Sequence, residues 1–389
     1  MTSTAGGNNG IPMTERAQGA FLGAAIGDAL GWPNEDRSSR VRTEGALAVV
    51  RTFQRWIRRS GGRYFPHEDV ILAGEYSDDT QLLLCTARSL LRGRAWWQHL
   101  ATCEVPLWTL YERGGGGATK RAADAWLGGH EPWSRDLKQE DRRRYFSAGG
   151  NGVAMRILPH VVADVDASDF KETARRIVAD GAITHGHPRA LLGALAYGYA
   201  LWCAFRKKDT LEFGGLLDLA LAGRESWSGL PAIEDFCPSW LAAAEECSAG
   251  PYESSWRATV EEVIRLLDQS RDAMKQGALA VDREALQRLG CFDRNVSSAG
   301  TVTGIAAIFL ASRYAADPAH GLMDAAFAHG ADTDTIASMT GAILGAIRGS
   351  EWLSEYAEQI QDAGYLRTLA RRIADLKSQS GEGQSAVSS

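Results

Sequence analysis

The chain has 389 residues, of which 45% are hydrophobic and 23% charged, and its formal net charge at pH 7 is −6. This is the composition of an ordinary globular protein with a large core, and the negative charge argues against a general nucleic-acid-binding function. The first apolar run, residues 20–32, is short and contains Asp28, so it is neither a signal peptide nor a membrane span. The six cysteines form no CxxC pair. We therefore expect reduced thiols and a cytoplasmic protein.

Helical periodicity dominates the chain, and convincing strand alternation is scarce. The pattern predicts helices at about residues 14–30, 79–93, 117–127, 170–181, 188–206, 256–274, 300–315, 322–329, 335–349 and 352–377. The helix at 335–349 carries Gly341, Gly345 and Gly349 at four-residue spacing. Glycine in a helix interior costs about 1 kcal/mol against alanine, so this row indicates that another backbone packs closely against it. The sequence predicts an all-α protein with a single compact bundle over residues 14–377.

Three segments fall outside this helical pattern. Residues 1–13 and 378–389 are rich in small and polar residues, and we predict them to be disordered tails. Residues 223–255 hold prolines, glycines and tryptophans and are predicted to be an irregular excursion. This excursion could be a lid or a partner surface, but a surface segment pinned to the body by its tryptophans is the simpler interpretation.

Two acidic clusters, each directly before a predicted helix, are the strongest functional signal in the chain. Residues 77–80 read Ser-Asp-Asp-Thr, and residues 332–335 read Asp-Thr-Asp-Thr. Helix capping would explain one carboxylate in each cluster, and the helix N-terminus compensates negative charge only in part. Hard divalent cations prefer oxygen ligands and would compensate the remaining carboxylates. We therefore predict that the two clusters meet in space and hold metal.

Several loops between the clusters carry side chains or backbone suited to a ligand. Glu35 follows Pro33, which ends the first helix, and it could point into a cleft or lie in solvent. Four glycines at 114–117 precede a helix, where backbone amides can approach an anion, although a merely flexible loop would look the same. Residues 149–152 and 184–188 also lead into helices. One of the two histidines in the second loop is expected to cap a helix or contact a ligand, and a structural histidine is equally compatible.

Taken in order, these segments resemble the ADP-ribosylglycohydrolase family. The matching stretches are residues 27–35, 76–82, 150–156, 184–188 and 332–337, so the resemblance extends over most of the chain. It implies an all-α orthogonal helical bundle with a cleft that holds a binuclear centre of two Mg²⁺ or Mn²⁺ ions.

The resemblance also implies roles for individual residues. Asp79 and Glu35 would be catalytic. The metal ligands would be Ser77, Asp78, Asp79, Asp332, Asp334 and Thr335. The substrate-binding residues would be Gly115, Gly116, Gly117, Ser147, Asn151, Gly152 and His185.

The implied activity is hydrolysis of the bond between the ribose C1″ of ADP-ribose and an acceptor side chain. We expect an ADP-ribosylated protein, with arginine as the favoured acceptor, or a small molecule that contains ADP-ribose; serine, a nucleic-acid base and an ester stay open, and no membrane partner is expected. An alternative is an immunity-type protein that binds ADP-ribose, or neutralises an ADP-ribosyltransferase, without turnover, for which residues 36–75 or 223–255 would be the contact segments. A structural protein akin to the family's lens crystallins is a third alternative. The intact acidic clusters favour the enzyme, because a scaffold has no physical reason to keep so many carboxylates together.

Overall fold

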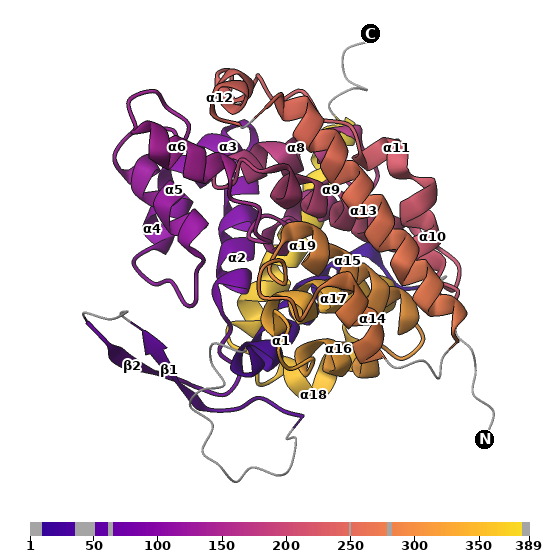
Figure 1. Ribbon diagram of the computed structural model, residues 1–389. Coiled ribbons are helices and arrows are strands. Elements are labelled where there is room, and N and C mark those ends of the chain that lie inside the picture. Colours follow the sequence, from indigo (N-terminus) through magenta and orange to yellow (C-terminus); the bar gives the residue numbers. More distant parts are fainter. Residues whose placement is uncertain (1–9, 36–50, 61–64, 249, 278–281, 383–389) are drawn as a thin grey trace, which may run out of the picture.

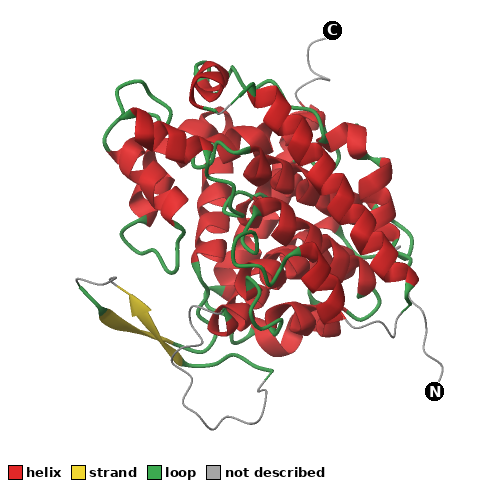
Figure 2. Ribbon diagram, viewed as in Figure 1, coloured by secondary structure: helices red, strands yellow, loops and turns green. Residues whose placement is uncertain are grey.

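The computed structural model describes residues 10–35, 51–60, 65–248, 250–277 and 282–382, and helices dominate them (Figures 1 and 2). This confirms the all-α prediction. The long helices are α1 (Met13–Gly31), α2 (Asp78–Leu90), α5 (Gly117–Leu127), α8 (Lys171–Ala182), α9 (Pro188–Arg206), α13 (Tyr252–Lys275), α15 (Gly300–Arg313), α17 (Thr333–Arg348) and α19 (Ala363–Glu382). Shorter helices complete the bundle: α3 (Trp96–His99), α4 (Val105–Trp108), α6 (Gln139–Phe146), α7 (Leu158–Ala163), α10 (Gly215–Ala222), α11 (Arg224–Trp227), α12 (Trp240–Cys247), α14 (Asp282–Leu289), α16 (Pro318–Ala326) and α18 (Ser354–Ala357).

The structure corrects three predicted boundaries near the C-terminus. Helix α16 begins at Pro318 and not at residue 322, because the side chain of Asp317 accepts a hydrogen bond from the backbone of His320 and caps the helix there. The single helix predicted over 352–377 is broken into α18 and α19, and Asp362 adopts a left-handed backbone with φ of 58° between them. Helix α19 then continues to Glu382, so the predicted disordered tail does not begin at residue 378.

The glycine row predicted to face another backbone packs against α1. The two helices run antiparallel, and a Cβ atom added to Gly23 would lie 2.2 Å from the carbonyl oxygen of Gly341. Gly345 approaches Gly19 in the same way. Any side chain at these positions would force the helices apart. Because of this packing, the C-terminal end of α1 lies next to the N-terminal end of α17. There the Thr333 hydroxyl donates a hydrogen bond to the carbonyl oxygen of Gly31 at 2.8 Å.

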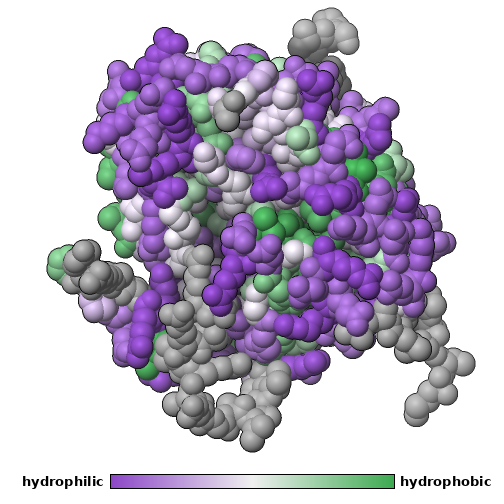
Figure 3. All heavy atoms as spheres, viewed as in Figure 1, coloured by the Kyte–Doolittle hydropathy of each residue, from purple (hydrophilic) through white to green (hydrophobic). Residues whose placement is uncertain are grey.

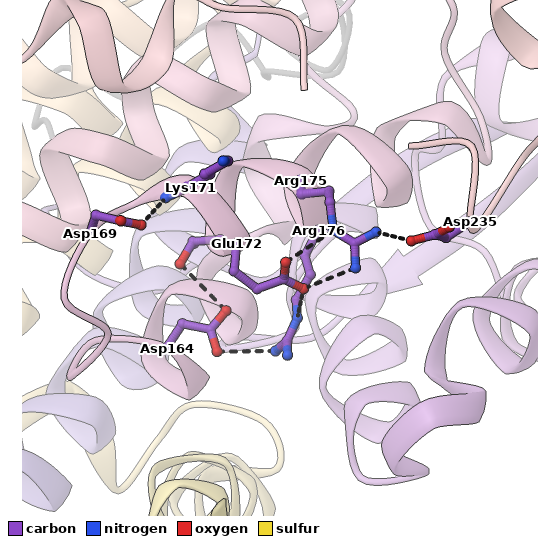
Figure 4. Close-up of polar contacts among 8 residues, drawn as sticks. Asp164, Asp169, Lys171, Glu172, Arg175, Arg176 and Asp235 are labelled. Carbon is purple, nitrogen blue, oxygen red and sulfur yellow. Dashed lines mark hydrogen bonds and ion pairs between the residues drawn. The ribbon is translucent and has the colours of Figure 1, made fainter. Parts of the chain in front are cut away.

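The excursion at 223–255 is more regular than predicted, because it contains α11 and α12. Its tryptophans are buried, and Trp240 Nε1 donates a hydrogen bond to the Tyr145 hydroxyl at 2.7 Å. Ion pairs fasten the segment to the body as well (Figure 4): Arg175 on α8 lies between Glu172 and Asp235, with an Nη1–Oδ2 distance of 2.9 Å to Asp235. These contacts support the interpretation of a surface segment pinned to the body.

A two-stranded hairpin is the one β element in the described residues, and the sequence pattern missed it. Strand β1 (Trp56–Ser60) pairs antiparallel with β2 (His67–Ile71), with Trp56 opposite Ile71. The hairpin stands off the helical body (Figure 1). It touches the body through Trp56, whose ring packs edge-on against Trp32 with 5.1 Å between centroids. Trp32 begins the short 3₁₀ helix η1 (Trp32–Asn34), which continues α1 and leads to Glu35.

Most of the cysteines lie in the apolar core. Five of the six cysteines are buried and all six are free thiols. No helix among the described residues combines the length and the apolar character needed to cross a membrane.

Candidate active site

The two acidic clusters meet where the N-terminal ends of α2 and α17 come together. The Thr335 hydroxyl donates a hydrogen bond to Asp79 Oδ1 at 3.3 Å. Ser77 is the N-cap of α2, and its side chain accepts a hydrogen bond from the Asp79 backbone. Asp332 is the N-cap residue of α17, and Asp334 lies in the first turn of that helix. Both helix N-termini therefore direct their positive ends at the same group of carboxylates.

Asp28 holds this arrangement together, and we did not assign it to the site from the sequence. Its Oδ1 accepts a hydrogen bond from the Ser77 backbone, and its Oδ2 accepts from both the backbone and the hydroxyl of Thr80, all at 2.6 to 3.0 Å. The side chain is fully buried on α1. An aspartate inside an otherwise apolar helix must find such partners, because an unsatisfied buried carboxylate is very costly. The position of Asp28 inside an apolar run was therefore the feature of the sequence that could have indicated its role in the site.

Burial and mutual repulsion perturb the titration of these acids. Burial first, and then the charges of Asp28, Asp78 and Asp332, raise the pKa of Asp79 well above its usual value. Burial and the nearby Glu35, Asp332, Asp79 and Asp28 raise the pKa of Asp334 in the same way. Asp78 responds likewise, with Asp28 and Glu35 as its largest charged neighbours. Glu35 is thus within electrostatic reach of both clusters, as its place after η1 suggests.

The donor chemistry of this acidic centre fits hard divalent cations. The second carboxylate oxygen of Asp79, Oδ2, is buried and has no hydrogen-bond partner among the described residues. The carboxylates of Asp28, Asp78 and Asp332 lie within electrostatic range of Asp79, and carboxylate oxygens are ligands that Mg²⁺ and Mn²⁺ prefer. Within the described part of the chain, however, no three acidic, histidine or cysteine side chains are already arranged to hold a metal ion. The binuclear centre therefore stays a prediction.

Asn151 reaches the edge of the acidic centre from the glycine-rich loop before α7, and His185, from the loop between α8 and α9, lies against that glycine-rich loop. Asn151 Nδ2 donates a hydrogen bond to Asp332 Oδ2 at 3.2 Å. A Cβ atom on Gly152 would lie 2.8 Å from His185 Cε1, so only glycine lets the loop pass the imidazole. Burial, with help from Arg156 and Arg121, lowers the pKa of His185 to about 3. The ring is therefore neutral at ordinary pH. His187 caps α9 by accepting a hydrogen bond from the Arg189 backbone.

The glycine loop at 114–117 passes along the other side of the acidic centre. A Cβ atom on Gly114 would lie 3.1 Å from Asp78 Oδ1, and one on Gly115 would overlap the Trp108 ring at 2.2 Å. Gly116 is the N-cap of α5, and no atom lies within 4 Å of the place its Cβ would occupy. The loop thus packs tightly at 114 and 115, opens at 116, and leads into the positive end of a helix.

A cavity of about 300 Å³ adjoins this loop. Its walls are mostly apolar and come from α5, α6 and the loop between them, with Arg121, Asp124 and Asp141 among its charged residues. Thr184, the neighbour of His185, closes one side. Ser147, in contrast, is exposed and lines a different groove with His187, and its hydroxyl donates to the Arg143 carbonyl oxygen. The structure thus places Asn151 beside Asp332 and the glycine loop beside Asp78, and it places Ser147 in a different groove.

A buried ionic network behind the loop was not recognised from the sequence. Arg156 Nε donates to Asp180 Oδ1 at 2.7 Å, and Arg156 Nη1 donates to the Gly152 carbonyl oxygen at 2.8 Å. His160 Nε2 lies 2.9 Å from Asp180 Oδ2. Burial alone would raise the pKa of Asp180, but Arg156 and His160 together lower it. The network anchors the loop that carries Asn151.

The fold and the acidic centre define an all-α protein in which the N-terminal ends of α2 and α17 and the C-terminal end of α1 meet at one group of carboxylates. The sequence model of the ADP-ribosylglycohydrolase family matches residues 10–383, and the chain belongs to this family. It is therefore a glycohydrolase that acts on an ADP-ribosylated substrate. This confirms the family and the enzyme class expected from the sequence.

Two curated proteins and one solved structure are similar to the chain. The uncharacterized protein YegU of Escherichia coli (strain K12) is 25% identical over 346 residues, which are 86% of this chain and 88% of YegU. The ADP-ribosyl-[dinitrogen reductase] glycohydrolase of Rhodospirillum rubrum is 30% identical over 192 residues, 49% of this chain and 58% of that protein. A solved structure described as an ADP-ribosylglycohydrolase-related protein complex shares the fold, with a TM-score of 0.60, 22% identity and coverage of 94% of this chain and 99% of its own.

Proposed function

We propose that the protein removes ADP-ribose from an acceptor side chain of a protein, with arginine as the acceptor, in a reaction that depends on two Mg²⁺ or Mn²⁺ ions. The observation that carries the proposal is the orphaned Asp79 Oδ2 inside a group of buried carboxylates. Buried carboxylates this close together either take up protons or pair with a cation, and a divalent cation would allow them to stay ionised. A leaving group that is cationic, as a guanidinium is, also suits such surroundings.

The residues that would hold the cations are Ser77, Asp78, Asp79, Asp332, Asp334 and Thr335. When bound, the cations would neutralise these carboxylates and polarise the oxygen atoms that they touch. Asp28 contributes without touching the substrate, because its hydrogen bonds keep the start of α2 in place.

The remaining residues act on the substrate. Breaking the C1″ bond builds positive charge on the ribose, which nearby carboxylates stabilise. Asp79 or Glu35 would accept the proton of the attacking water, help that is typically worth ~10²–10⁴-fold. The backbone of Gly115, Gly116 and Gly117, with the positive end of α5, suits the diphosphate. Asn151, Gly152 and the neutral His185 border the centre on the opposite side, and the adjoining apolar cavity has room for a nucleoside.

The experiment that tests this proposal offers the purified protein ADP-ribosylated arginine, serine and nucleic-acid substrates with Mg²⁺, Mn²⁺ or EDTA. We expect free ADP-ribose from the arginine substrate, and none in EDTA. Release from a different acceptor alone would replace arginine in the proposal. Binding of ADP-ribose without release from any substrate would instead support a protein that binds ADP-ribose without turnover.

A further inference from the structure

Exposed large apolar side chains concentrate in two segments of the chain that are joined near the start of α2. Ten such side chains occur in the described residues, and six of them lie in two segments, the hairpin with the turn after it and the stretch from α4 toward α5. Phe65 is 82% exposed and Leu110 is 81% exposed, and Val70, Leu72 and Leu107 are about half exposed. Apolar patches this concentrated on a surface mark an interaction site more often than chance exposure does. Figure 3 shows apolar colour at the outer end of the hairpin, and further apolar areas over the middle of the same face.

The hairpin is coupled directly to the acidic centre. Besides the contact of Trp56 with Trp32, the Arg58 guanidinium lies over the Trp32 ring, 5.9 Å from its centroid. Trp32 in turn borders Gly114, because a Cβ atom there would be 3.4 Å from Trp32 Nε1. The inner face of the hairpin therefore forms part of the wall that runs from Gly114 to Glu35.

The second segment joins the hairpin at its base. Arg113 pairs with Glu75 at 3.1 Å, and Glu75 Oε2 accepts a hydrogen bond from the Leu72 backbone at 2.8 Å. The Arg113 carbonyl oxygen accepts a hydrogen bond from the Asp78 backbone at 2.7 Å. Leu72 on one side and Leu110 on the other are thus tied to the same point at the start of α2. Figure 1 shows the loop between α4 and α5 reaching toward the hairpin.

The outer face of the hairpin carries exposed apolar side chains and packs against no other element within the described residues. Side chains alternate along a strand, so Ile57 and Val70 share the face that points away from Trp32 with the ion pair of Arg59 and Glu68, and Leu72 follows directly after the strand. A two-stranded hairpin is at best marginally stable in water. Its charges are largely balanced internally, because Arg58 pairs with Asp69 and Arg59 with Glu68.

Two exposed arginines precede the hairpin and add positive charge. The side chains of Arg51 and Arg55 are exposed and make no ion pair or hydrogen bond with another described residue. Their charge complements a partner that carries carboxylates. A nucleic acid fits less well, because it requires an extended basic stripe, whereas this surface is chiefly apolar and the chain has a net charge of −6.

We propose that Phe65, Val70, Leu72, Leu107 and Leu110 form the docking surface for the protein that carries the ADP-ribose. The partner is a folded protein with an apolar patch beside its modified side chain and carboxylates opposite Arg51 and Arg55. This inference rests on the proposed function. The docking surface adds affinity for the acceptor protein, while the acidic centre and the glycine loops hold the ADP-ribose.

The test compares one linkage on two substrates, an ADP-ribosylated folded protein and the same ADP-ribosylated amino acid free in solution. Because buried anchors carry most of the energy of an interface, the double variant Phe65→Ser/Leu110→Ser should lower kcat/KM for the protein by about tenfold or more, mainly through KM. Hydrolysis of the free amino acid should not change, which also shows that the variant is folded. Phe213→Ser and Leu241→Ser, at exposed apolar positions outside the two segments, are the matched controls and should alter neither substrate.

Three results would overturn the docking surface. One is an unchanged kcat/KM for the protein in the double variant, and another is an equal loss on both substrates. The third is a loss confined to an ADP-ribosylated oligonucleotide, which would assign the surface to nucleic acid. Wild-type protein that hydrolyses neither the protein nor the amino acid would instead reject the proposed function, on which the inference depends.

Discussion

The Thr335 hydroxyl donates a hydrogen bond to Asp79 Oδ1 at 3.3 Å, across 256 residues of sequence. The other oxygen of the same carboxylate, Oδ2, is buried and has no hydrogen-bond partner among the described residues. One oxygen of Asp79 is thus used to join two helix starts, and the other is directed among acidic side chains. This division is what we expect of a carboxylate that has both a structural and a ligand-binding role.

Asp79→Asn and Asp334→Asn should each lower hydrolysis of ADP-ribosylated substrate by ~10²–10⁴-fold, the range for loss of a catalytic proton acceptor or its electrostatic support. The substitutions keep the shape of the side chain and remove repulsion within the cluster. The cation-free variants should therefore melt no lower than the wild type. The wild type should gain thermal stability on addition of Mg²⁺, by mass action on the folded state, and the variants should gain less. Asp209→Asn, at an exposed position, is the control. Full activity of either cluster variant would reject their assignment to the site.

Gly23→Ala should destabilise the protein by about 3 kcal/mol, the upper range for inserting one group into a tightly packed contact. The added Cβ would lie 2.2 Å from the carbonyl oxygen of Gly341, and neither backbone can move without separating α1 from α17. Activity should fall as well, because the same contact sets the position of Glu35 relative to Asp332. Chemical unfolding measures the loss. Gly364→Ala, where no atom lies within 4 Å of the added Cβ, should change stability by less than about 1 kcal/mol. Equal effects of the two substitutions would contradict the packing argument.

Asp180→Ala should cost about 3–5 kcal/mol in the free energy of unfolding, because it leaves Arg156 buried without its counter-charge. The double variant Asp180→Ala/Arg156→Met should lose less than the sum of the single losses, since it buries no unpaired charge. Glu140→Ala breaks the exposed pair with Arg144 and should cost less than about 1 kcal/mol. If the loss in the double variant equals the sum of the two single losses, Asp180 and Arg156 do not stabilise each other, and the prediction is wrong.

His185 should make the folded protein less stable in weak acid. Its folded-state pKa is about 3, below its ordinary value, because burial disfavours the charged ring. Below about pH 6.5 the unfolded chain takes up a proton that the folded chain does not, so stability falls by up to about 1.4 kcal/mol per pH unit until the folded pKa is reached. Above about pH 6.5 the residue contributes no pH dependence.

Unfolding free energies at about pH 7 and about pH 5 test this prediction. The wild type should lose about 2 kcal/mol more than His185→Gln over this interval. His130→Gln, at a partly exposed position, should keep the pH dependence of the wild type. An identical pH dependence for His185→Gln and the wild type would show that the imidazole is not held neutral by burial.

Local patterns in the sequence were sufficient for most helices. The prediction for 188–206 coincides with α9, and that for 117–127 coincides with α5, because periodicity and the proline or glycines at each start are properties of neighbouring residues. The break at Asp362 was missed, since a single left-handed residue leaves the apolar period intact. The hairpin was missed because Trp56 pairs with Ile71 and packs against Trp32. These contacts join residues far apart in the sequence, so no local pattern predicts them.

The sequence by itself determined the family, the all-α class, the glycine row on α17 and the two acidic clusters. These follow from short motifs and from interactions within about one helical turn. Only the tertiary structure decided that Asp28 supports the start of α2, that Asp180 and Arg156 anchor the loop of Asn151, that Ser147 faces a different groove and that the hairpin stands beside the acidic centre. Each of these depends on which helices pack together. The close contact of α1 with α17 brings residues some three hundred positions apart to one place, and contacts at that separation are set by packing of the whole core.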